Sequence, residues 1–493
     1  MSPQPLRLGV LFAASAALLS ACAVGPNYKR PPLSGSEGYG PAAAPPTAAE
    51  QHPELVSGQD IPAEWWGVFH SQDLDALVAE ALRKNPTIEA ARATLRSARE
   101  QVRAQRGAYF PSVSASLQPS RQRVAPVLAS PLQSNEDLYN LTTTQVSVAY
   151  TPDLFGANRR AVESLAAQAD QQRFELQAAR LTLASNVVQA AVQDAALREQ
   201  VTAAEAIVAD QREILTSLRR QHELGQTSDA DVAAQEALLA QTEATLPPLQ
   251  KAFGVNRDLL AALVGRTPGE ALDARFDLRA LTLPERLPLS LPAQLVRRRP
   301  DVRIAEAELH AASAQVGVAT AARWPSIELD AAGGSAALGL TPTFNSVSNF
   351  WSLAATLTQP IFQGRALLHR QRAAEAAYEA AAAQYRATVV GAFQNTADVL
   401  HALSTDADAF TAAETSETAS RRSLEIARRQ LALGDISRLA VLNAEQVEAQ
   451  ARLARLQAEA ARYADVAALY QALGGGWWNA PADGPAKPAG TAR

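Results

Sequence analysis

The residue of this 493-residue chain best suited to chemistry is its single cysteine, Cys22. One thiol cannot form an intrachain disulfide, so its presence needs another explanation. The preceding residues read MSPQPLRLGVLFAASAALLSA, in which Arg7 supplies a positive charge and an apolar run extends from Leu8 to Leu19. That run is too short to span a bilayer as a helix and is typical of a secretory signal. We therefore expect residues 1–21 to be a signal peptide.

The residues Leu19-Ser20-Ala21-Cys22 resemble a bacterial lipobox. The resemblance implies that the thiol of Cys22 receives diacylglycerol and its amine an acyl chain, a covalent anchor that several chains would make stable. Ala23, in place of an aspartate, implies export to the outer membrane. The alternative is an ordinary secretory signal with an incidental cysteine.

Other reactive constellations are absent from the sequence. It contains no GxSxG, HExxH, GxxxxGK[ST] or CxxC motif, and its six histidines lack metal-ligand spacing. The net charge of −5 and the pI of about 5.8 argue against a nucleic-acid partner. We therefore expect no enzyme, no metal site and no cofactor other than the lipid on Cys22.

The sequence contains an internal duplication, which predicts the order of helices and strands. Pro86 and Pro111 recur as Pro300 and Pro325, each 214 residues later. Each half follows one plan of helix, strands, long helix, glycine turn and long helix. The predicted divisions are a signal peptide (1–21), a lipidated tether (22–62), a first repeat (63–265), a linker (266–286), a second repeat (287–473) and a disordered tail (474–493).

Two strands in each repeat alternate between apolar and polar residues. Their predicted ranges are about 112–124 and 141–152 in the first repeat, and about 326–337 and 350–361 in the second. In the third strand, Glu328 and Asp330 fall on the polar side. Strands of this length suit a membrane barrel with an acidic lumen, although a soluble antiparallel sheet has the same pattern. Four strands cannot close a barrel, so a membrane sheet requires several chains, and three chains supply twelve strands.

The long helices, predicted as the pairs 157–264 and 365–473, indicate a rod or a tube. Residues 157–223 contain neither proline nor glycine, which allows a helix on the order of 100 Å long. Apolar residues recur every seven positions, as in a coiled coil. They are Leu176, Leu183, Ala190, Leu197 and Ala204 in the first repeat, and Leu442, Ala449, Leu456, Tyr463 and Tyr470 in the second.

Short motifs throughout the chain suggest a family. They are CAVGPNYKRP from Cys22, PAEWWGVF from Pro62, LDALV from Leu74, DLFG from Asp153 and PIF from Pro360. Over about residues 20–475 the chain closely resembles the NodT-type outer-membrane efflux lipoproteins of the TolC/OprM superfamily.

The resemblance implies a mainly α fold with membrane β structure. It is a TolC-like homotrimer with a twelve-stranded β-barrel, four strands per chain, on a twelve-helix coiled-coil tube with an equatorial domain. The barrel would lie in outer-membrane lipid and the tube in the periplasm. The tips at Gly225 and Gly434 would meet a periplasmic adaptor and an inner-membrane pump of the RND type.

The resemblance also implies a gate near these tips. Leu439 and Asn443 match a leucine and an aspartate that constrict the pore, and Asp231 matches an acidic residue of the first tip. Asn443 replaces the aspartate and Ala440 stands where some relatives carry one, so Asp231 would have to supply the charge for any cation block. Alternatively, Leu439 belongs to a coiled-coil core and Asp231 stabilises a helix N-terminus capped by Ser228.

We therefore expect a passive exit duct for drugs or other small solutes. Two alternatives remain open at this stage. A type I secretion duct would pass proteins, and a structural periplasmic lipoprotein would only act as a spacer.

Overall fold

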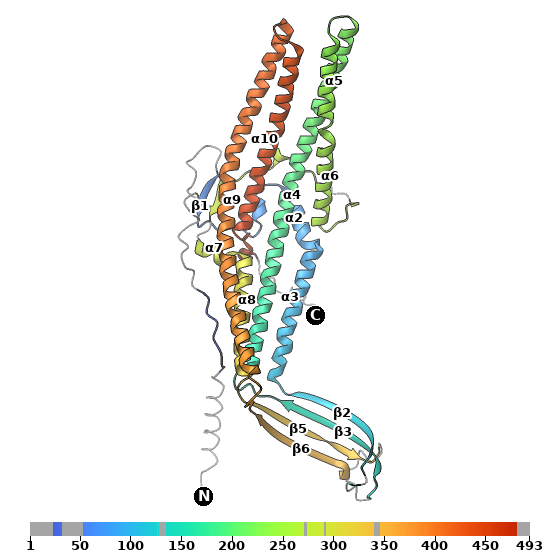
Figure 1. The fold of residues 1–493 in the computed structure, drawn as a ribbon, viewed down its shortest axis with the longest axis vertical. Coiled ribbons are helices and arrows are strands. Elements are labelled where there is room, and N and C mark those ends of the chain that lie inside the picture. Colours follow the sequence, from blue (N-terminus) through green and yellow to red (C-terminus); the bar gives the residue numbers. More distant parts are fainter. Residues whose placement is uncertain are drawn as a thin grey trace, which may run out of the picture. The chain divides into compact units, whose positions relative to one another are not determined.

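The computed structural model describes residues 23–31, 53–125, 127, 135–270, 274–289, 292–339 and 346–480. Cys22, the signal peptide and most of the predicted tether lie outside these residues. The chain forms two compact units, each of which draws on both sequence repeats (Figure 1). Of the described residues, those within 1–31, 94–172 and 305–385 form unit 1, and those within 32–93, 173–304 and 386–493 form unit 2. The repeats do not fold as separate bodies, because elements of one pair with elements of the other.

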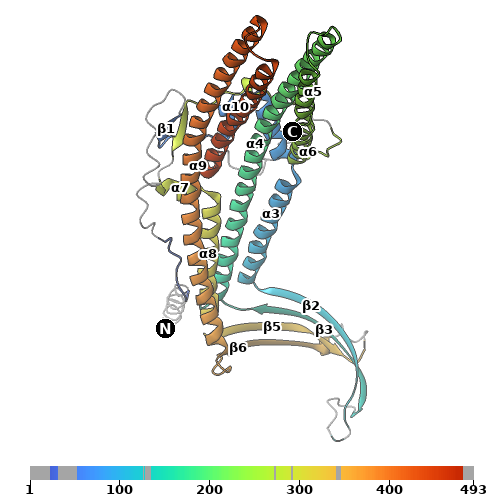
Figure 2. The ribbon, with the colours of Figure 1, turned by 45° about the horizontal axis from the view of Figure 1, so that its top comes forward.

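Unit 1 contains a four-stranded antiparallel sheet in the order β2-β3-β5-β6 (Figure 2). Its observed strand ends lie within three residues of the predicted ones. β6 ends before Pro360, which cannot donate a ladder hydrogen bond. The central pairing, β3 with β5, joins the two repeats. The strands are β2 (Ser112–Arg123), β3 (Leu138–Tyr150), β5 (Ser326–Ala337) and β6 (Asn349–Thr358).

Helices make up most of the remaining described chain. Pro86 and Pro300 each occupy a first helical position, where a missing N–H costs nothing. The two longest helices, α4 and α9, have 67 and 68 residues. The helices are α2 (Gln72–Lys84), α3 (Pro86–Arg106), α4 (Ala157–Glu223), α5 (Asp229–Glu243), α6 (Leu246–Leu263), α7 (Pro292–Arg298), α8 (Pro300–Ala321), α9 (Ala366–Leu433) and α10 (Arg438–Ala472).

The second long helix of the first repeat is broken, contrary to the prediction of one continuous helix up to residue 264. α5 ends at Glu243, and α6 begins at Leu246 with prolines in its first turn. A proline inside a helix removes a hydrogen bond and clashes with the preceding turn, so the helix restarts here. The corresponding α10 contains no proline and is continuous.

The seven-residue pattern in α4 marks buried positions as expected. Leu176, Leu183, Ala190, Leu197 and Ala204 are all buried, and four of the five positions in α10 are too. The exception is Ala449, which is half-buried. A short parallel pair of strands, β1 (Glu54–Ser57) and β4 (Arg286–Leu289), also belongs to unit 2.

Aromatic side chains pack between the turn η2 and the C-terminal end of α10 in unit 2. The turn η2 (Trp65–Phe69) comes from the EWWGVF motif. Trp65 stacks on Tyr470 with ring centroids 5.3 Å apart, and Phe69 contacts Tyr463 at 6.1 Å. The Tyr463 hydroxyl donates to the carbonyl oxygen of Leu281 at 2.9 Å. The motif residues therefore hold the end of α10 in place.

Two predicted flexible segments are partly packed. In the predicted tail, the turn η7 (Trp477–Asn479) is ordered, because Trp477 Nε1 donates to the Arg298 carbonyl at 2.7 Å and its ring meets Phe174. In the predicted tether, Ile61 is fully buried and residues 54–57 form β1. Apolar and aromatic burial outweighs the flexibility suggested by the flanking Gly and Pro residues.

Across the described ranges, no helix combines the length and hydropathy needed to cross a membrane.

Candidate functional site

The first candidate site is an exposed apolar face on the four-stranded sheet. Val113 pairs with Val148, which pairs with Ala331, which pairs with Leu353. Directly paired residues point to the same side, so this register gathers the apolar residues of all four strands on one face. Large members of the face are exposed, including Trp351 at 82%. A contiguous apolar patch of this kind marks a surface that contacts lipid or protein.

Glu328 and Asp330 lie on the opposite face. Glu328 pairs with Thr356, and Asp330 pairs with Ala149 and Ala354. Ser114 and Ser147, which pair with each other, share this face. It is therefore polar, as the alternation predicts, and it carries two carboxylates next to the start of β5.

The outer edges of β2 and β6 have no strand partner within the part of the chain that the structure describes. β2 has 12 residues and β6 has 10, so each edge exposes a long row of backbone donors and acceptors. Inside lipid these groups would need partners from another chain.

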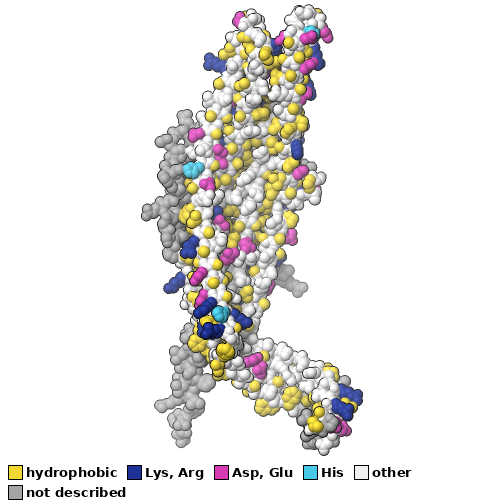
Figure 3. Space-filling view, in the orientation of Figure 1, with side chains coloured by type: hydrophobic (Ala, Val, Ile, Leu, Met, Phe, Trp, Pro, Cys, Tyr) yellow, Lys and Arg dark blue, Asp and Glu magenta, His cyan; other side chains and the backbone are white. Residues whose placement is uncertain are grey.

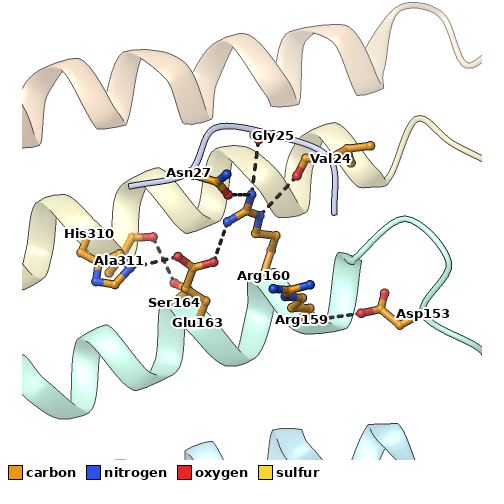
Figure 4. A network of polar contacts seen from close by, with 10 residues as sticks. All are labelled: Val24, Gly25, Asn27, Asp153, Arg159, Arg160, Glu163, Ser164, His310 and Ala311. Atoms are coloured by element: carbon orange, nitrogen blue, oxygen red, sulfur yellow. Dashed lines mark hydrogen bonds and ion pairs between the residues drawn. The ribbon is translucent and has the colours of Figure 1, made fainter. Parts of the chain in front are cut away.

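The second candidate site is the segment that follows Cys22, residues 23–31, which we call the N-terminal arm (Figure 4). Arg160 of α4, itself 4% exposed, holds the arm. Its guanidinium donates to the carbonyl oxygens of Val24 and Gly25 at 3.3 Å each and to Asn27 Oδ1 at 2.7 Å. A fourth bond, 2.7 Å long, goes to Glu163 Oε2. One buried side chain thus fixes three positions of the arm, Val24, Gly25 and Asn27.

Further contacts fasten the arm to α8. The ring of Tyr28 stacks on His310 with centroids 4.4 Å apart, and Arg30 pairs with Glu306. Gly25, with φ of +93°, lies so close to Gly317 that a Cβ would meet its Cα at 2.5 Å. The arm is therefore a docked strap between α4 and α8, and the chain leading to Cys22 departs from a defined point on unit 1.

The third candidate site is the pair of hairpin tips in unit 2. Gly225 and Gly434 have φ of +70° and +80°, a left-handed conformation that favours glycine. Each lies just past the end of its long helix, α4 or α9. Each repeat also has an interhelical ion pair near its tip. Arg219 pairs with Glu236 at 2.8 Å in the first repeat, and Arg428 pairs with Glu445 at 3.1 Å in the second, at positions 209 residues further along the chain.

Asp231 lies in the first turn of α5, where it forms a capping box with Ser228. Its Oδ2 accepts bonds from the Ser228 hydroxyl at 2.6 Å and from Thr227 Oγ1 at 3.1 Å. The Ser228 hydroxyl and backbone, with Thr227, hold the pKa of Asp231 below its usual range. Asp231 therefore remains charged near the tip, with its carboxylate already bonded within its own turn.

Leu439 and Asn443 lie on α10, one helical turn apart. Leu439 is 55% exposed and Asn443 is exposed. Within this chain, then, Leu439 does not occupy a buried coiled-coil position. Both side chains are free to meet another copy or to line a passage.

A groove of about 850 Å³ runs along the α9–α10 hairpin. Ala427, Ala440 and Ala444 line it, together with Ile426 and Arg422. The matching positions of the first repeat carry Leu218, Asp231 and Gln235. Gln235 is fully buried there and donates to the Gln211 carbonyl at 3.3 Å. Small residues in place of larger ones thus open the groove in the second hairpin.

Sequence reasoning missed Arg160 and the neighbouring half-buried carboxyl groups of Asp406 and Asp465. Arg160 stands beside the exposed Arg159, and nothing in the pattern distinguishes the two. Asp465 Oδ2 is buried without a hydrogen-bond partner among the described residues. Burial and the nearby Asp406 raise the pKa of Asp465 to about 7.

The fold and these sites are those of an outer-membrane channel of the TolC type. The solved outer-membrane channel OprN superimposes with a TM-score of 0.83 at 27% identity, covering 92% of this chain and 100% of that one. The open-state outer-membrane channel MtrE of Neisseria gonorrhoeae gives 0.81 at 26% identity, covering 92% and 99%. The pyoverdine export outer-membrane protein OpmQ of Pseudomonas putida is 30% identical over 448 residues, 90% of this chain and 94% of that protein.

A family model described as outer membrane efflux protein matches residues 77–266 and 291–475. The chain belongs to the outer membrane efflux protein family. The two matched segments correspond to the two repeats, and the predicted function of an outer-membrane efflux duct is confirmed.

Proposed function

We propose that three copies of this chain form a lipid-anchored, passive exit duct that releases small solutes delivered by an adaptor and an RND-type inner-membrane pump. The observation that carries this proposal is the four-stranded sheet, which has an exposed apolar face, a polar opposite face and two edges that no other described strand pairs with. The edge of β6 in one copy would pair with β2 of the next. Three copies close a twelve-stranded barrel and leave no backbone edge in lipid.

The polar face, with Glu328 and Asp330, would then line the lumen. The duct binds no substrate tightly and performs no catalysis. Its cargo is small and is selected by the pump. The relative OpmQ is a pyoverdine export protein, which supports a small-molecule cargo class here.

Cys22 would carry the lipid anchor. The docked N-terminal arm supports this assignment, because it holds Ala23 against Gly156 just where β3 leads into α4. Cys22→Ser would abolish incorporation of labelled palmitate. Continued labelling of that variant would exclude the anchor, and the remaining membrane association would report on the barrel alone.

The gate would lie at the tips, formed by Leu439, Asn443 and Asp231 of three copies around the axis. Partner-driven untwisting of the tip helices would open it. Asn443→Asp would place three carboxylates at this level and increase block of single-channel conductance by divalent cations. Gln430→Glu, which adds an equal charge to an exposed position on α9, is the matched control. Equal block in the two variants would remove Asn443 from the gate.

The adaptor would dock at the tips Gly225 and Gly434, and the α9–α10 groove is the surface that we assign to it. An alanine-lined groove between two helices accepts a packed helical segment. Ala444→Gln restores the residue type of the first repeat and would fill the groove. The expected result is weaker adaptor binding with unchanged conductance. Ala454→Gln, at an exposed position farther along α10 and outside the groove, serves as the control.

The whole proposal is tested in cells by deleting the gene and measuring accumulation of a fluorescent efflux substrate together with antibiotic sensitivity. Higher accumulation, reversed by the wild-type chain, supports the duct. Normal accumulation together with loss of a secreted protein would favour type I secretion instead.

A further inference from the structure

We infer that unit 1 carries a basic collar, at the junction of strands and helices, that binds the phosphate groups of anionic phospholipids. The collar consists of the four connections between strands and helices together with the adjoining ends of α3, α4 and α9, residues 103–111, 151–159, 322–325 and 359–372. The inference rests on the proposed function, because it requires the sheet to lie in a bilayer.

The collar is strongly and unevenly charged. Its four segments contain seven arginines and one acidic residue, Asp153. Figure 3 shows basic side chains gathered with a histidine at the foot of α9. The arginines are Arg103, Arg106, Arg159, Arg323, Arg365, Arg370 and Arg372, all exposed.

The protein itself leaves most of this charge uncompensated. Asp153 is engaged, since its two oxygens accept from the backbone N–H groups of Asn158 and Arg159 at 3.0 and 2.7 Å. Arg103 pairs with Glu100 on α3, and Arg323 donates to the neutral Gln371. The other five arginines have no ion-pair partner among the described residues. At the tips, Arg219 and Arg428 each pair with a glutamate, whereas Arg220 and Arg429 have no ion-pair partner among the described residues.

Exposed aromatic and apolar side chains mark the same level. Phe110 precedes β2, Trp324 precedes β5, and Ile361 and Phe362 follow β6. All four are exposed, Ile361 at 93%. Phe155, which follows β3, stacks on Trp324 at 5.1 Å. Aromatic rings concentrate at the headgroup level of membranes, so these residues place the collar at the boundary between the apolar sheet face and water.

Guanidinium groups bind phosphate through paired hydrogen bonds as well as charge. A basic cluster at a membrane boundary therefore favours anionic over zwitterionic headgroups, by about fivefold for each arginine near the surface. The N-terminal arm adds an independent constraint. It leads to Cys22 from beside Gly156 at the start of α4, so the acyl anchor would enter the same leaflet as the bound phospholipids.

The test uses the full acylated protein in nanodiscs of equal phosphatidylglycerol and phosphatidylcholine. After gentle re-extraction, mass spectrometry measures the ratio of the two lipids that remain bound. We expect phosphatidylglycerol to be enriched at least about fivefold. The combined change Arg365→Gln, Arg370→Gln and Arg372→Gln should remove most of this enrichment. The matched control Arg212→Gln, Arg220→Gln and Arg429→Gln removes the same charge from the helices of the two tip hairpins, and we expect it to retain the phosphatidylglycerol enrichment.

The inference is overturned if the wild-type protein retains the two lipids in equal amounts. It is also overturned if the control variant loses as much phosphatidylglycerol enrichment as the collar variant. Conductance in pure phosphatidylcholine bilayers separates this failure from failure of the proposed function. Channels without lipid enrichment would reject only the collar. A protein that forms no channels in either lipid would reject the duct, and the collar with it.

Discussion

Ser228 and Asp231 bond to each other in both directions at the first tip. The Asp231 N–H donates to Ser228 Oγ at 3.2 Å, while Asp231 Oδ2 accepts from the Ser228 hydroxyl and N–H. The second tip lacks this arrangement. Ser437 precedes α10 at the matching position and makes no side-chain cap, and Ala440, which stands where Asp231 stands in the first repeat, has no carboxylate to accept from the Ser437 N–H. The two tips therefore differ in how firmly their return helices begin.

Asp231→Ala should loosen the first turn of α5. Loss of a capping side chain costs about 1 kcal/mol, so amides of residues 229–233 should exchange roughly fivefold faster. Hydrogen–deuterium exchange with mass spectrometry measures this. Ala440→Asp is the mirror variant and should slow exchange at the start of α10. Unchanged exchange in both variants would show that the capping box contributes nothing to tip stability.

Asp465 predicts a specific dependence of stability on pH. Burial and Asp406 raise its pKa from 3.8 to about 7. Between these values the folded state keeps a proton that the unfolded state has released. Stability should therefore fall as pH rises from about 4 to about 7, and then level off. Asp465→Asn imitates the protonated form, so its thermal midpoint should exceed that of the wild type by a few degrees at pH 8 and match it near pH 4.

Helical circular dichroism during heating provides the measurement. Asp398→Asn, at an exposed site on the same helix as Asp406, is the control and should leave the slope with pH unchanged. Parallel pH profiles for the wild type and Asp465→Asn would disprove the role of this carboxyl group.

The elements themselves could be predicted because their signals are periodic. The alternation of apolar and polar residues predicted the two sides of each strand, and the observed register puts Val113, Val148, Ala331 and Leu353 on one face. The glycine turns and the proline at the start of α8 also carry local signals. What periodicity could not indicate was the order of the strands, since it depends on long-range pairing.

Contacts between distant segments escaped prediction for the same reason. Arg160 lies more than 130 residues from Asn27, and only the folded chain brings them together. The order of residues 474–480 likewise depends on partners such as Arg298 and Asp60, which bond to Trp477 and Trp478. A glycine- and proline-rich composition predicts local flexibility. It does not indicate which distant residues a tryptophan in the same segment contacts in the folded chain.

Arg160→Ala should release the N-terminal arm from unit 1. It removes the donor shared by Val24, Gly25 and Asn27 and leaves Glu163 with only its partner His310. Arg160 is buried but the Glu163 side chain is 27% exposed, so loss of these hydrogen bonds should cost about 1–3 kcal/mol. Limited proteolysis should then cut the arm between Lys29 and Arg30, while Arg159→Ala should leave it resistant. An arm that stays resistant without Arg160 would mean that Tyr28 and Arg30 suffice to hold it.

Gly334→Ala should disrupt the sheet where the two repeats join. Gly334 pairs with Gln145, and a Cβ at this position would lie 2.1 Å from the Thr144 carbonyl oxygen, a backbone atom that cannot move without shifting β3. Such overpacking costs about 1–3 kcal/mol in each chain, and a trimer would bear it three times. Gly333→Ala is an unusually close control, because the nearest atom to its Cβ would be 4.0 Å away. We expect Gly334→Ala to reduce the yield of heat-resistant trimers in detergent and Gly333→Ala to preserve it. Equal yields would show that β3 and β5 can separate locally without loss of assembly.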